Sequence, residues 1–421
     1  MLIARIVMKK VLIFLPQNLY PPQTGFHKRC LELIDGCKQL GCEITLASST
    51  QTTQRPWTPA IVESVKTDGI KEVEIYEPGF LDRRFAQGLR RFYGLKNIAP
   101  PLGSMIHTPP GFRRWFARLI KRTAPDLVLI NYAFWGGLLD GRSGGEAAPV
   151  KVMETIDLLS LNAQMWHLLE KHLPPPPVDA SVIDNQILEE DFFTRRDLAV
   201  HPEEYAIYDK FDYTIAISRH EAETIRRHTA HTEVLHIPMT QSPRYIDNRY
   251  DGAALFPTGP NPFNMQGYLY FVKRVLPLVR SRNPSFRLQV TGYCSERVAP
   301  EENIILSGFV PDLEAVYESA RFVVCPIFGG TGQQVKIVEA MARGVPVVAL
   351  RAVAERSPIR HGINGLVADN AEEFAEHVCR LWDDAGLCRR LGDEARNAVA
   401  AESSNSHVTD ALASMLEARG N

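Results

Sequence analysis

The fold is decided by the segment Phe322-Val-Val-Cys-Pro-Ile-Phe-Gly-Gly-Thr-Gly-Gln-Gln-Val-Lys-Ile-Val-Glu-Ala-Met-Ala-Arg-Gly-Val-Pro-Val-Val348. Its first seven residues are almost continuously apolar, as in a parallel strand covered on both faces. The glycine-rich turn Gly329–Gly332 follows, and then a stretch of helical periodicity with Val335, Val338 and Met341 on one face. A strand, a glycine-rich turn and a helix in this order predict a βα unit of a doubly wound parallel sheet.

The same alternation of strand and helix extends over most of the chain. In the first half, short apolar runs predict strands at Val11–Leu15, Glu43–Ala47, Glu72–Tyr76, Leu127–Tyr132, Val150–Thr155 and Tyr213–Ile217. In the second half, the corresponding runs are Ala254–Pro257, Arg287–Thr291, Ile304–Leu306, Phe322–Cys325, Val347–Leu350 and Leu366–Ala368. Helices are expected at about 26–40, where Gly41 supplies a left-handed cap, and at about 264–282, 312–319, 333–343 and 371–383.

A chain of 421 residues is too long for one typical core, so we expect two α/β domains. They are predicted at 1–245 and 246–400, joined by a segment without periodicity at about 240–252, and followed by a C-terminal helix within 401–421. One face of that helix is apolar, but the periodicity does not indicate what it packs against. An insertion at 160–205, which contains four consecutive prolines, interrupts the first domain; we expect it to bear on acceptor specificity.

Charge and composition exclude several classes of protein. The formal net charge of -2 gives no electrostatic case for a nucleic-acid partner. The basic clusters Arg83-Arg84, Arg113-Arg114 and Lys121-Arg122 are solvated helix faces or, alternatively, a surface for anionic lipid headgroups. No stretch is long and apolar enough to span a bilayer, and Met1–Pro16 lacks a signal-peptide cleavage site. We therefore expect a cytoplasmic protein, with peripheral contact at the inner face of the membrane as the alternative.

The glycine-rich turn is a physical site for an anion. Glycine lets the backbone approach a ligand closely, and the first N–H groups of the following helix lack partners within the helix. Lys336 adds a cation, and Glu339 lies about 60° around the helix, where its carboxylate can accept the hydroxyl groups of a ribose. The pattern indicates a site for a nucleoside diphosphate. The alternative is that Lys336 and Glu339 form an ordinary exposed i,i+3 ion pair.

The run from Gly330 to Val348 resembles a long signature of the retaining GT-B glycosyltransferases of family 4, G-x-G-x-x-x-K-x-x-E-A-M-A-x-G-x-P-V-V. Similarity continues upstream in Asn303–Leu313 and downstream in His361–Val367. It is weaker in the amino half, at Lys151–Asp157 and Asp212–Ala222. The resemblance implies the GT-B fold, which consists of two Rossmann-like doubly wound domains that face each other across a cleft. It also implies a nucleotide diphosphate-sugar donor, and a glycan, lipid-linked molecule or protein as acceptor.

The resemblance assigns roles to the matching residues. Glu339 would bind the ribose, and Lys336 would neutralise the donor phosphates and the leaving diphosphate. The base would lie against Phe309 and the backbone of Gly308 and Val310. The remaining predicted donor-site residues are Gly329, Gly330, Thr331, Gly332, Gln333, Gln334 and Asn261. Thr24, Gly25 and Asp157 are expected in the acceptor side of the cleft, although the turn that contains Thr24 and Gly25 could equally be an ordinary strand–helix connection.

Several departures from the family pattern limit these assignments. Thr331 stands where many relatives have an acidic residue, so the sequence does not identify the donor sugar. The arginine and lysine that often follow the first strand of the second domain are missing, and Asn261 and backbone amides are expected to substitute for them. Asn131-Tyr132 replaces the usual histidine near the fourth strand. No Asp-x-Asp motif occurs, which favours catalysis without a metal and without any cofactor; retention of the anomeric configuration is implied by the resemblance alone.

Two other functions share the same architecture. A nucleotide-sugar epimerase or hydrolase would use the same diphosphate site, but it needs a set of acids and bases near the sugar that the sequence does not reveal. A non-catalytic GT-B scaffold would explain the missing family residues. A dehydrogenase is disfavoured, because the first strand–helix turn at Pro16–Gly25 lacks a Gly-x-Gly-x-x-Gly fingerprint.

Overall fold

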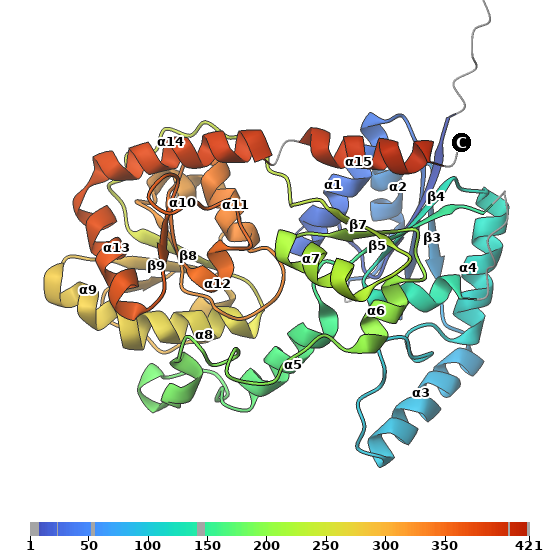
Figure 1. Ribbon diagram of the computed structural model, residues 1–421, viewed down its shortest axis with the longest axis horizontal. Coiled ribbons are helices and arrows are strands. Elements are labelled where there is room, and N and C mark those ends of the chain that lie inside the picture. The colour runs from blue at the N-terminus through green and yellow to red at the C-terminus, as the bar shows by residue number, and fades with distance from the viewer. Residues whose placement is uncertain (1–7, 23, 52–54, 141–147, 403–404, 419–421) are drawn as a thin grey trace, which may run out of the picture. The chain divides into compact units, whose positions relative to one another are not determined.

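The computed structural model describes residues 8–22, 24–51, 55–140, 148–402 and 405–418. Residues 1–7 and 419–421, the extreme ends of the predicted first domain and C-terminal helix, lie outside the described residues. The chain forms two compact units (Figure 1). Unit 1 comprises 1–160, 200–238 and 405–421, and unit 2 comprises 161–199 and 239–404. Among the described residues, no helix is long and apolar enough to cross a membrane.

Over its described residues, unit 1 contains a seven-stranded parallel sheet with the strand order β3-β2-β1-β4-β5-β6-β7. The strands are β1 (Lys10–Leu15), β2 (Glu43–Ser49), β3 (Glu72–Tyr76), β4 (Leu127–Asn131), β5 (Val150–Glu154), β6 (Tyr213–Ala216) and β7 (Glu233–His236). The first six confirm the predicted strands to within two residues at either end. The edge strand β7 was not predicted from the sequence, because only Val234 in it is buried and it therefore lacks an apolar run.

Helices cover the sheet of unit 1. They are α1 (Gly25–Gln39), α2 (Pro59–Thr67), α3 (Phe80–Leu95), α4 (Pro110–Thr123), η1 (Ala133–Leu139), α6 (Pro202–Tyr208), α7 (Arg219–His228) and α15 (Asn405–Glu417). Helix α1 ends as expected, since Gly41 just beyond it has a φ of 68° that a side chain would disfavour.

The C-terminal helix α15 belongs to unit 1 and packs against α1. A β-carbon on Gly36 of α1 would lie 2.9 Å from Leu412 and 3.1 Å from Val408, so the two helices approach closely only because Gly36 has no side chain. The predicted apolar face of the helix is therefore the one that is buried. The segment predicted at 401–421 as a separate C-terminal part is instead divided, because α14 of unit 2 continues to Glu402.

Unit 2 contains, over its described residues, a six-stranded parallel sheet with the order β10-β9-β8-β11-β12-β13. The strands are β8 (Ala254–Thr258), β9 (Leu288–Gly292), β10 (Ile304–Leu306), β11 (Val323–Cys325), β12 (Val347–Leu350) and β13 (Leu366–Ala368). The main helices are α8 (Pro262–Tyr270), α9 (Leu276–Arg282), α10 (Leu313–Ser319), α11 (Val335–Ala342), α12 (Arg351–Ala354), α13 (Ala371–Asp383) and α14 (Ala385–Glu402). The single helix predicted at 264–282 is interrupted by the π-helical turn η4 (Phe271–Val275), and η5 (Tyr293–Glu296) follows β9.

The insertion predicted within the first domain belongs instead to unit 2, which takes residues 161–199. It contains most of α5 (Leu159–Glu170) and the short helices η2 (Ala180–Val182) and η3 (Asn185–Leu188). The side chain of Gln266 donates to the carbonyl of Ile187 at 2.8 Å, and Arg274 forms an ion pair with Glu189 at 2.6 Å. The prediction assigned this segment to the wrong unit because it relied on position in the sequence. The segment is held to unit 2 by buried phenylalanines and backbone groups, which leave no periodic pattern in the sequence.

Candidate functional site

The glycine-rich turn lies between β11 and α11, at the carboxyl edge of the sheet of unit 2. Gly330 has a φ of 89°, a conformation that glycine adopts without strain. A β-carbon on Gly329 would lie 2.3 Å from Phe263 and 2.7 Å from Phe193, whose rings are buried. These two glycines are therefore required by backbone conformation and by close packing, and the aromatic rings fix the position of the turn.

Lys336 is the second residue of α11, and its amine donates a hydrogen bond to the side-chain oxygen of Asn264. The nitrogen also lies 4.8 Å from the centre of the Phe256 ring. Burial lowers the pKa of Lys336, while the nearby Cys325, Cys294 and Glu339 act in the opposite direction. The amine is thus a partly desolvated cation held at the carboxyl edge of the sheet.

Glu339 is 6% exposed and lies one turn after Lys336 on α11. Glu339 is buried and Lys336 is half-buried, so the two side chains are not the fully exposed i,i+3 pair of the alternative. Arg343, one turn further, donates to the backbone carbonyl of Glu339 at 3.0 Å and pairs with Glu314 at 2.6 Å. The Arg343 guanidinium also lies 4.8 Å from the centre of the Tyr317 ring. These contacts of Arg343 hold in place the face of α11 that bears Glu339.

Asn261 caps α8, since its side-chain oxygen accepts a hydrogen bond from the N–H of Phe263 at 2.9 Å. The sequence predicted Asn261 as a substitute for missing cations, whereas the contact with Lys336 is made by Asn264. The amide nitrogen of Asn264 donates to the Gly259 carbonyl at 3.3 Å, which links Lys336 to the turn after β8. Sequence reasoning missed Asn264 because it looked there for positive charge, not for an acceptor that orients an existing cation.

Arg356 is a second buried cation beside the glycine-rich turn. It donates to the backbone carbonyl of Gly330 and, at 2.9 Å, to that of Ala352. Sequence reasoning missed it because it lies outside the quoted signature. The strand order offered a signal, since β12 neighbours β11 and residues that follow β12 must therefore reach the same edge of the sheet.

The predicted base-binding segment follows β10 at the same edge. Gly308 has a φ of 62°, and its carbonyl accepts a hydrogen bond from the N–H of Gly292, the last residue of β9, at 2.6 Å. Val310 is half-buried against the core, whereas Phe309 is 67% exposed. An exposed aromatic ring on a backbone that is fixed on both sides is suited to stack on a flat ligand.

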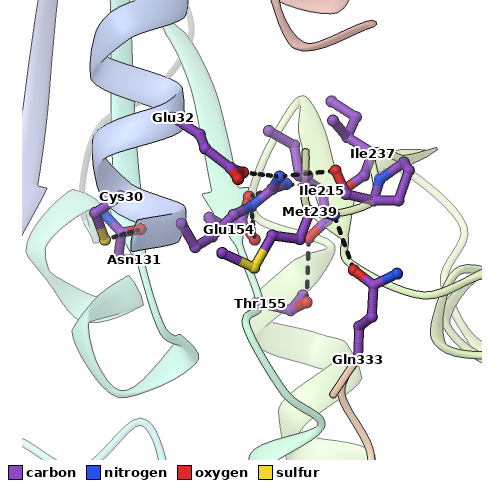
Figure 2. A network of polar contacts seen from close by, with 11 residues as sticks. Cys30, Glu32, Asn131, Glu154, Thr155, Ile215, Ile237, Met239 and Gln333 are labelled. Atoms are coloured by element: carbon purple, nitrogen blue, oxygen red, sulfur yellow. Dashed lines mark hydrogen bonds and ion pairs between the residues drawn. The ribbon is translucent and has the colours of Figure 1, made fainter. Parts of the chain in front are cut away.

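The remaining residues of the turn are largely occupied by contacts within unit 2. The side-chain oxygen of Gln333 accepts from the N–H of Met239 at 3.0 Å (Figure 2). Gln334 is the capping residue before α11, and its carbonyl accepts a hydrogen bond from the N–H of Ile337, while Thr331 and Gly332 are buried. The side chain of Gln333 therefore holds the turn in place, and ligand contacts from this stretch would come from the backbone.

The three residues predicted on the acceptor side lie in unit 1. Thr24 caps α1 by accepting a hydrogen bond from the N–H of His27 at 3.3 Å, and Gly25 is the first helical residue. Asp157 is half-buried just after β5, and its charge adds to the burial that raises the pKa of Tyr132. The capping by Thr24 is what an ordinary strand–helix connection provides, so that alternative remains open for Thr24 and Gly25.

A buried ion pair in unit 1 was not predicted. Arg29 of α1 reaches both carboxylate oxygens of Glu154, at 3.2 and 3.1 Å, and both side chains are almost fully buried. The same guanidinium donates to the carbonyls of Ile237 and Pro238 at 2.9 and 3.2 Å (Figure 2). Burial alone would lower the pKa of Arg29, but Glu154 holds it above its ordinary value. This pair ties α1 to the end of β5 and to the backbone that leaves β7.

Comparisons with known proteins place these features in context. Residues 255–384 match the family model described as Glycosyl transferases group 1. The structure is similar over 97% of the chain to sucrose-phosphate synthase from Thermosynechococcus elongatus, with 98% of that chain covered, a TM-score of 0.61 and 15% identity. It is similar over 97% to Anabaena HepE in complex with UDP and glucose, with 100% of that chain covered, a TM-score of 0.59 and 14% identity.

The fold is that of the GT-B glycosyltransferases. In sequence, the chain is 32% identical over 85 residues to the lipopolysaccharide core biosynthesis glycosyltransferase LpsE of Rhizobium meliloti, covering 20% of this chain and 25% of that protein. The matches to curated relatives span between a quarter and about a third of the length of those proteins. Within the described residues, no group of three or more His, Cys, Asp or Glu side chains is arranged to hold a metal ion.

Proposed function

We propose that this chain is a glycosyltransferase that uses a nucleotide diphosphate-sugar donor bound by unit 2. The observation that carries the proposal is the arrangement at the start of α11. A glycine-rich turn precedes the helix, and the partly desolvated amine of Lys336 and the buried Glu339 lie within its first one and a half turns. The match of residues 255–384 to Glycosyl transferases group 1 includes all three features.

The diphosphate would be bound by backbone amides of the turn and by Lys336. The first N–H groups of α11 have no partners within the helix, and the helix dipole places about half a positive charge there. Asn264 holds the Lys336 amine by accepting a hydrogen bond from one of its three N–H groups, which leaves the others for phosphate oxygens. As the bond to the sugar breaks, negative charge grows on the leaving diphosphate and is met by dipoles and a cation that are already in place.

The nucleoside would extend from the same point along the edge of the sheet. The carboxylate of Glu339 would accept hydrogen bonds from the ribose hydroxyls, each contributing about 1.5–3 kcal/mol. The base would stack on Phe309 and contact the backbone of Gly308 and Val310. Because Anabaena HepE has been solved with UDP and glucose, UDP is the first nucleotide to test.

We also propose that transfer retains the anomeric configuration and proceeds without a metal or other cofactor. The support for metal independence is the presence of Lys336 and the α11 amides, which can supply the positive charge that a metal would otherwise provide. Retention is supported by the likeness of Gly330–Val348 to the family signature. The acceptor would be a glycan, a lipid-linked molecule or a protein, and the donor sugar stays open because Thr331 replaces the acidic family residue.

A thermal-shift screen tests the proposal. The protein is melted with UDP, GDP, ADP or dTDP, each with Mg²⁺ and with EDTA. A nucleotide at a hundred times its Kd stabilises the folded protein by about 2.7 kcal/mol, so at least one should raise the Tm in EDTA. Glu339→Gln should lose most of that shift, whereas the control Glu302→Gln, at a residue whose side chain is 84% exposed, should keep it. No shift with any nucleotide would contradict the proposal.

A second measurement separates an enzyme from an inert scaffold. The chain is incubated with the sugar form of the nucleotide selected in the screen, and release of the free nucleoside diphosphate is followed. Slow hydrolysis that is lost in Lys336→Met supports a transferase site, because water can replace an absent acceptor. Nucleotide binding with no release, in the presence of membrane and glycan extracts as acceptor sources, would support the scaffold instead.

A further inference from the structure

Helix α3 of unit 1 carries an apolar stripe that the described residues of its unit leave exposed. Leu81, Phe85, Phe92 and Leu95 are between 38% and 79% exposed. With Gly88 between them, their spacing of four, three, four and three residues places them within an arc of about 80° on the helix. Phe80, beside the start of the stripe, and Ile98, just beyond its end, are exposed as well.

The stripe is not the face by which α3 packs on the rest of unit 1. That face is marked by the buried Ala86 and by Asp82, the only carboxylate in the helix sequence. Asp82 accepts hydrogen bonds from the Tyr76 hydroxyl and, at 2.9 Å, from the N–H of Gly111 in α4. The helix is therefore held at the periphery of the unit beside α4 (Figure 1), with its acidic group turned inward and its large apolar groups turned outward.

Cationic side chains flank the stripe. Arg84 and Arg91 lie seven residues apart along one side of it, and Arg84 is 5.3 Å from the centre of the Phe80 ring. Lys96, at the end of the helix, is 4.7 Å from the Phe92 ring. The neighbouring α4 adds the exposed Arg114, Arg118 and Lys121, whereas its Arg122 is paired with Glu72 and Glu74. A basic helix with an exposed apolar face combines the two signals that bind a helix to the surface of an anionic bilayer.

We propose that α3 docks unit 1 on an anionic lipid bilayer, lying parallel to the surface. The stripe of Leu81, Phe85, Phe92 and Leu95 would enter the boundary between headgroups and acyl chains. Arg84, Arg91 and Lys96 would contact the phosphates of the headgroups. Bare charge attraction would favour any polyanion, but apolar groups of this size gain free energy only where they leave water, and a bilayer is the anionic surface that offers this. The proposal does not depend on the proposed catalytic function.

Co-sedimentation of the full-length chain with vesicles tests the docking surface. Vesicles of phosphatidylglycerol mixed with phosphatidylcholine are compared with pure phosphatidylcholine at about 0.15 M salt. We expect binding to the mixed vesicles only. The stripe variant Phe85→Ser/Phe92→Ser should weaken it roughly tenfold or more, because two aromatic groups no longer leave water. The control Val182→Ser/Ile363→Ser removes two exposed apolar groups from unit 2 and should bind like the wild type.

A matched pair of charge variants tests the orientation of the helix. Arg84→Gln/Arg91→Gln should weaken binding by about fivefold for each arginine. Arg83→Gln/Arg90→Gln removes the same charge from the other side of the helix. Because that side would lie farther from the bilayer surface than the Debye length of about 8 Å, this variant should weaken vesicle binding clearly less. Since Arg83 also donates to the Pro78 carbonyl at 2.9 Å, thermal melting first establishes that both variants are folded.

Three results would overturn the proposal. The first is absence of wild-type binding to the mixed vesicles, and the second is wild-type binding that the stripe variant does not reduce. The third is a stripe variant that changes the oligomeric state in gel filtration but not vesicle binding, which would assign the stripe to contact with a second copy of the chain. Nucleotide shifts and donor hydrolysis are measured without vesicles, so failure of this proposal leaves the proposed function standing.

Discussion

The substitution Gly329→Ala tests whether the glycine-rich turn is fixed from behind by aromatic rings. The added β-carbon would lie 2.3 Å from Cδ1 of Phe263 and 2.7 Å from Cε2 of Phe193, far inside van der Waals contact. Phe263 is 1% and Phe193 is 3% exposed, and the two rings pack edge to face with centroids 5.7 Å apart. Neither ring has space to retreat, so the turn itself must move.

Overpacking of this kind costs about 1–3 kcal/mol. In a domain of the size of unit 2, each kcal/mol lowers the Tm by about 2–4 °C. The shifted turn should also bind the nucleotide selected in the screen more weakly. Differential scanning calorimetry and isothermal titration measure the two effects.

Gly259→Ala is the matched control, since Gly259 lies at the same edge of the sheet and an added β-carbon there would meet no atom within 4 Å. Phe193→Leu should partly restore both Tm and nucleotide affinity in the Gly329→Ala background, because it opens space beside the new methyl group. If Gly329→Ala behaves like Gly259→Ala, or if Phe193→Leu only adds to the damage, the packing argument is wrong.

Three further changes test other parts of the structure. Lys336→Met should weaken nucleotide diphosphate binding by about tenfold to a hundredfold through loss of one charged contact, and Lys336→Arg should retain part of the wild-type affinity. Equal binding by the wild type and both variants in a titration would contradict the assignment of Lys336 to the diphosphate. Glu154→Gln should lower the free energy of unfolding in urea by about 3–5 kcal/mol, since the buried Arg29 loses its two-oxygen carboxylate partner and keeps only the Glu32 carboxylate, at 3.3 Å. A loss below about 1 kcal/mol would contradict this. Acidification from about pH 6.5 to about pH 4 should destabilise unit 1, because burial lowers the pKa of His27, His107 and His236 to about 4. The unfolded chain protonates these histidines more readily, so each should lower the free energy of unfolding by about 1.4 kcal/mol per pH unit in this range. Urea unfolding measured against pH checks this, and a flat profile would refute it.

Most of the strands could be predicted from the sequence, because buried parallel strands consist of continuous apolar runs. The buried strands Val347–Leu350 and Leu366–Ala368 begin and end in the structure where composition placed them. Ile304–Leu306 does so too, because it is apolar although it is only partly buried. The edge strand Glu233–His236 has one buried residue and so left no run to detect. The π-helical turn within 264–282 left no sequence signal either, since Phe271, Val272 and Val275 continue the buried apolar residues of the flanking helices.

Long-range packing could not be predicted in the same way. The insertion was placed in the first domain because it follows β5 in sequence, yet Phe193 packs behind Gly329 in unit 2. A role in positioning the glycine-rich turn now stands beside the acceptor role predicted for the insertion. The C-terminal helix showed its apolar face but not its partner, because its complement on α1 is the absence of a side chain at Gly36.

In the candidate site, local spacing predicted the groups but not their supports. Lys336 and Glu339 stand out because they follow a glycine-rich turn on one helix. Asn264 and Arg356 do not, since they reach the turn only through the adjacency of β8 and β12 to β11. A search of every segment that follows a strand of the second domain would have found both residues.

The most direct test of the diphosphate-and-ribose site is a titration with paired ligands. The ribonucleoside diphosphate selected in the screen (UDP, GDP or ADP) is compared with its 2′-deoxy form by isothermal titration, for the wild type and for Glu339→Gln. The wild type should prefer the ribose form by about tenfold to a hundredfold, because a hydroxyl bound to a carboxylate contributes about 1.5–3 kcal/mol, and Glu339→Gln should lose most of that preference. Equal affinity of the wild type for both forms, or the same preference in Glu339→Gln, would contradict the account.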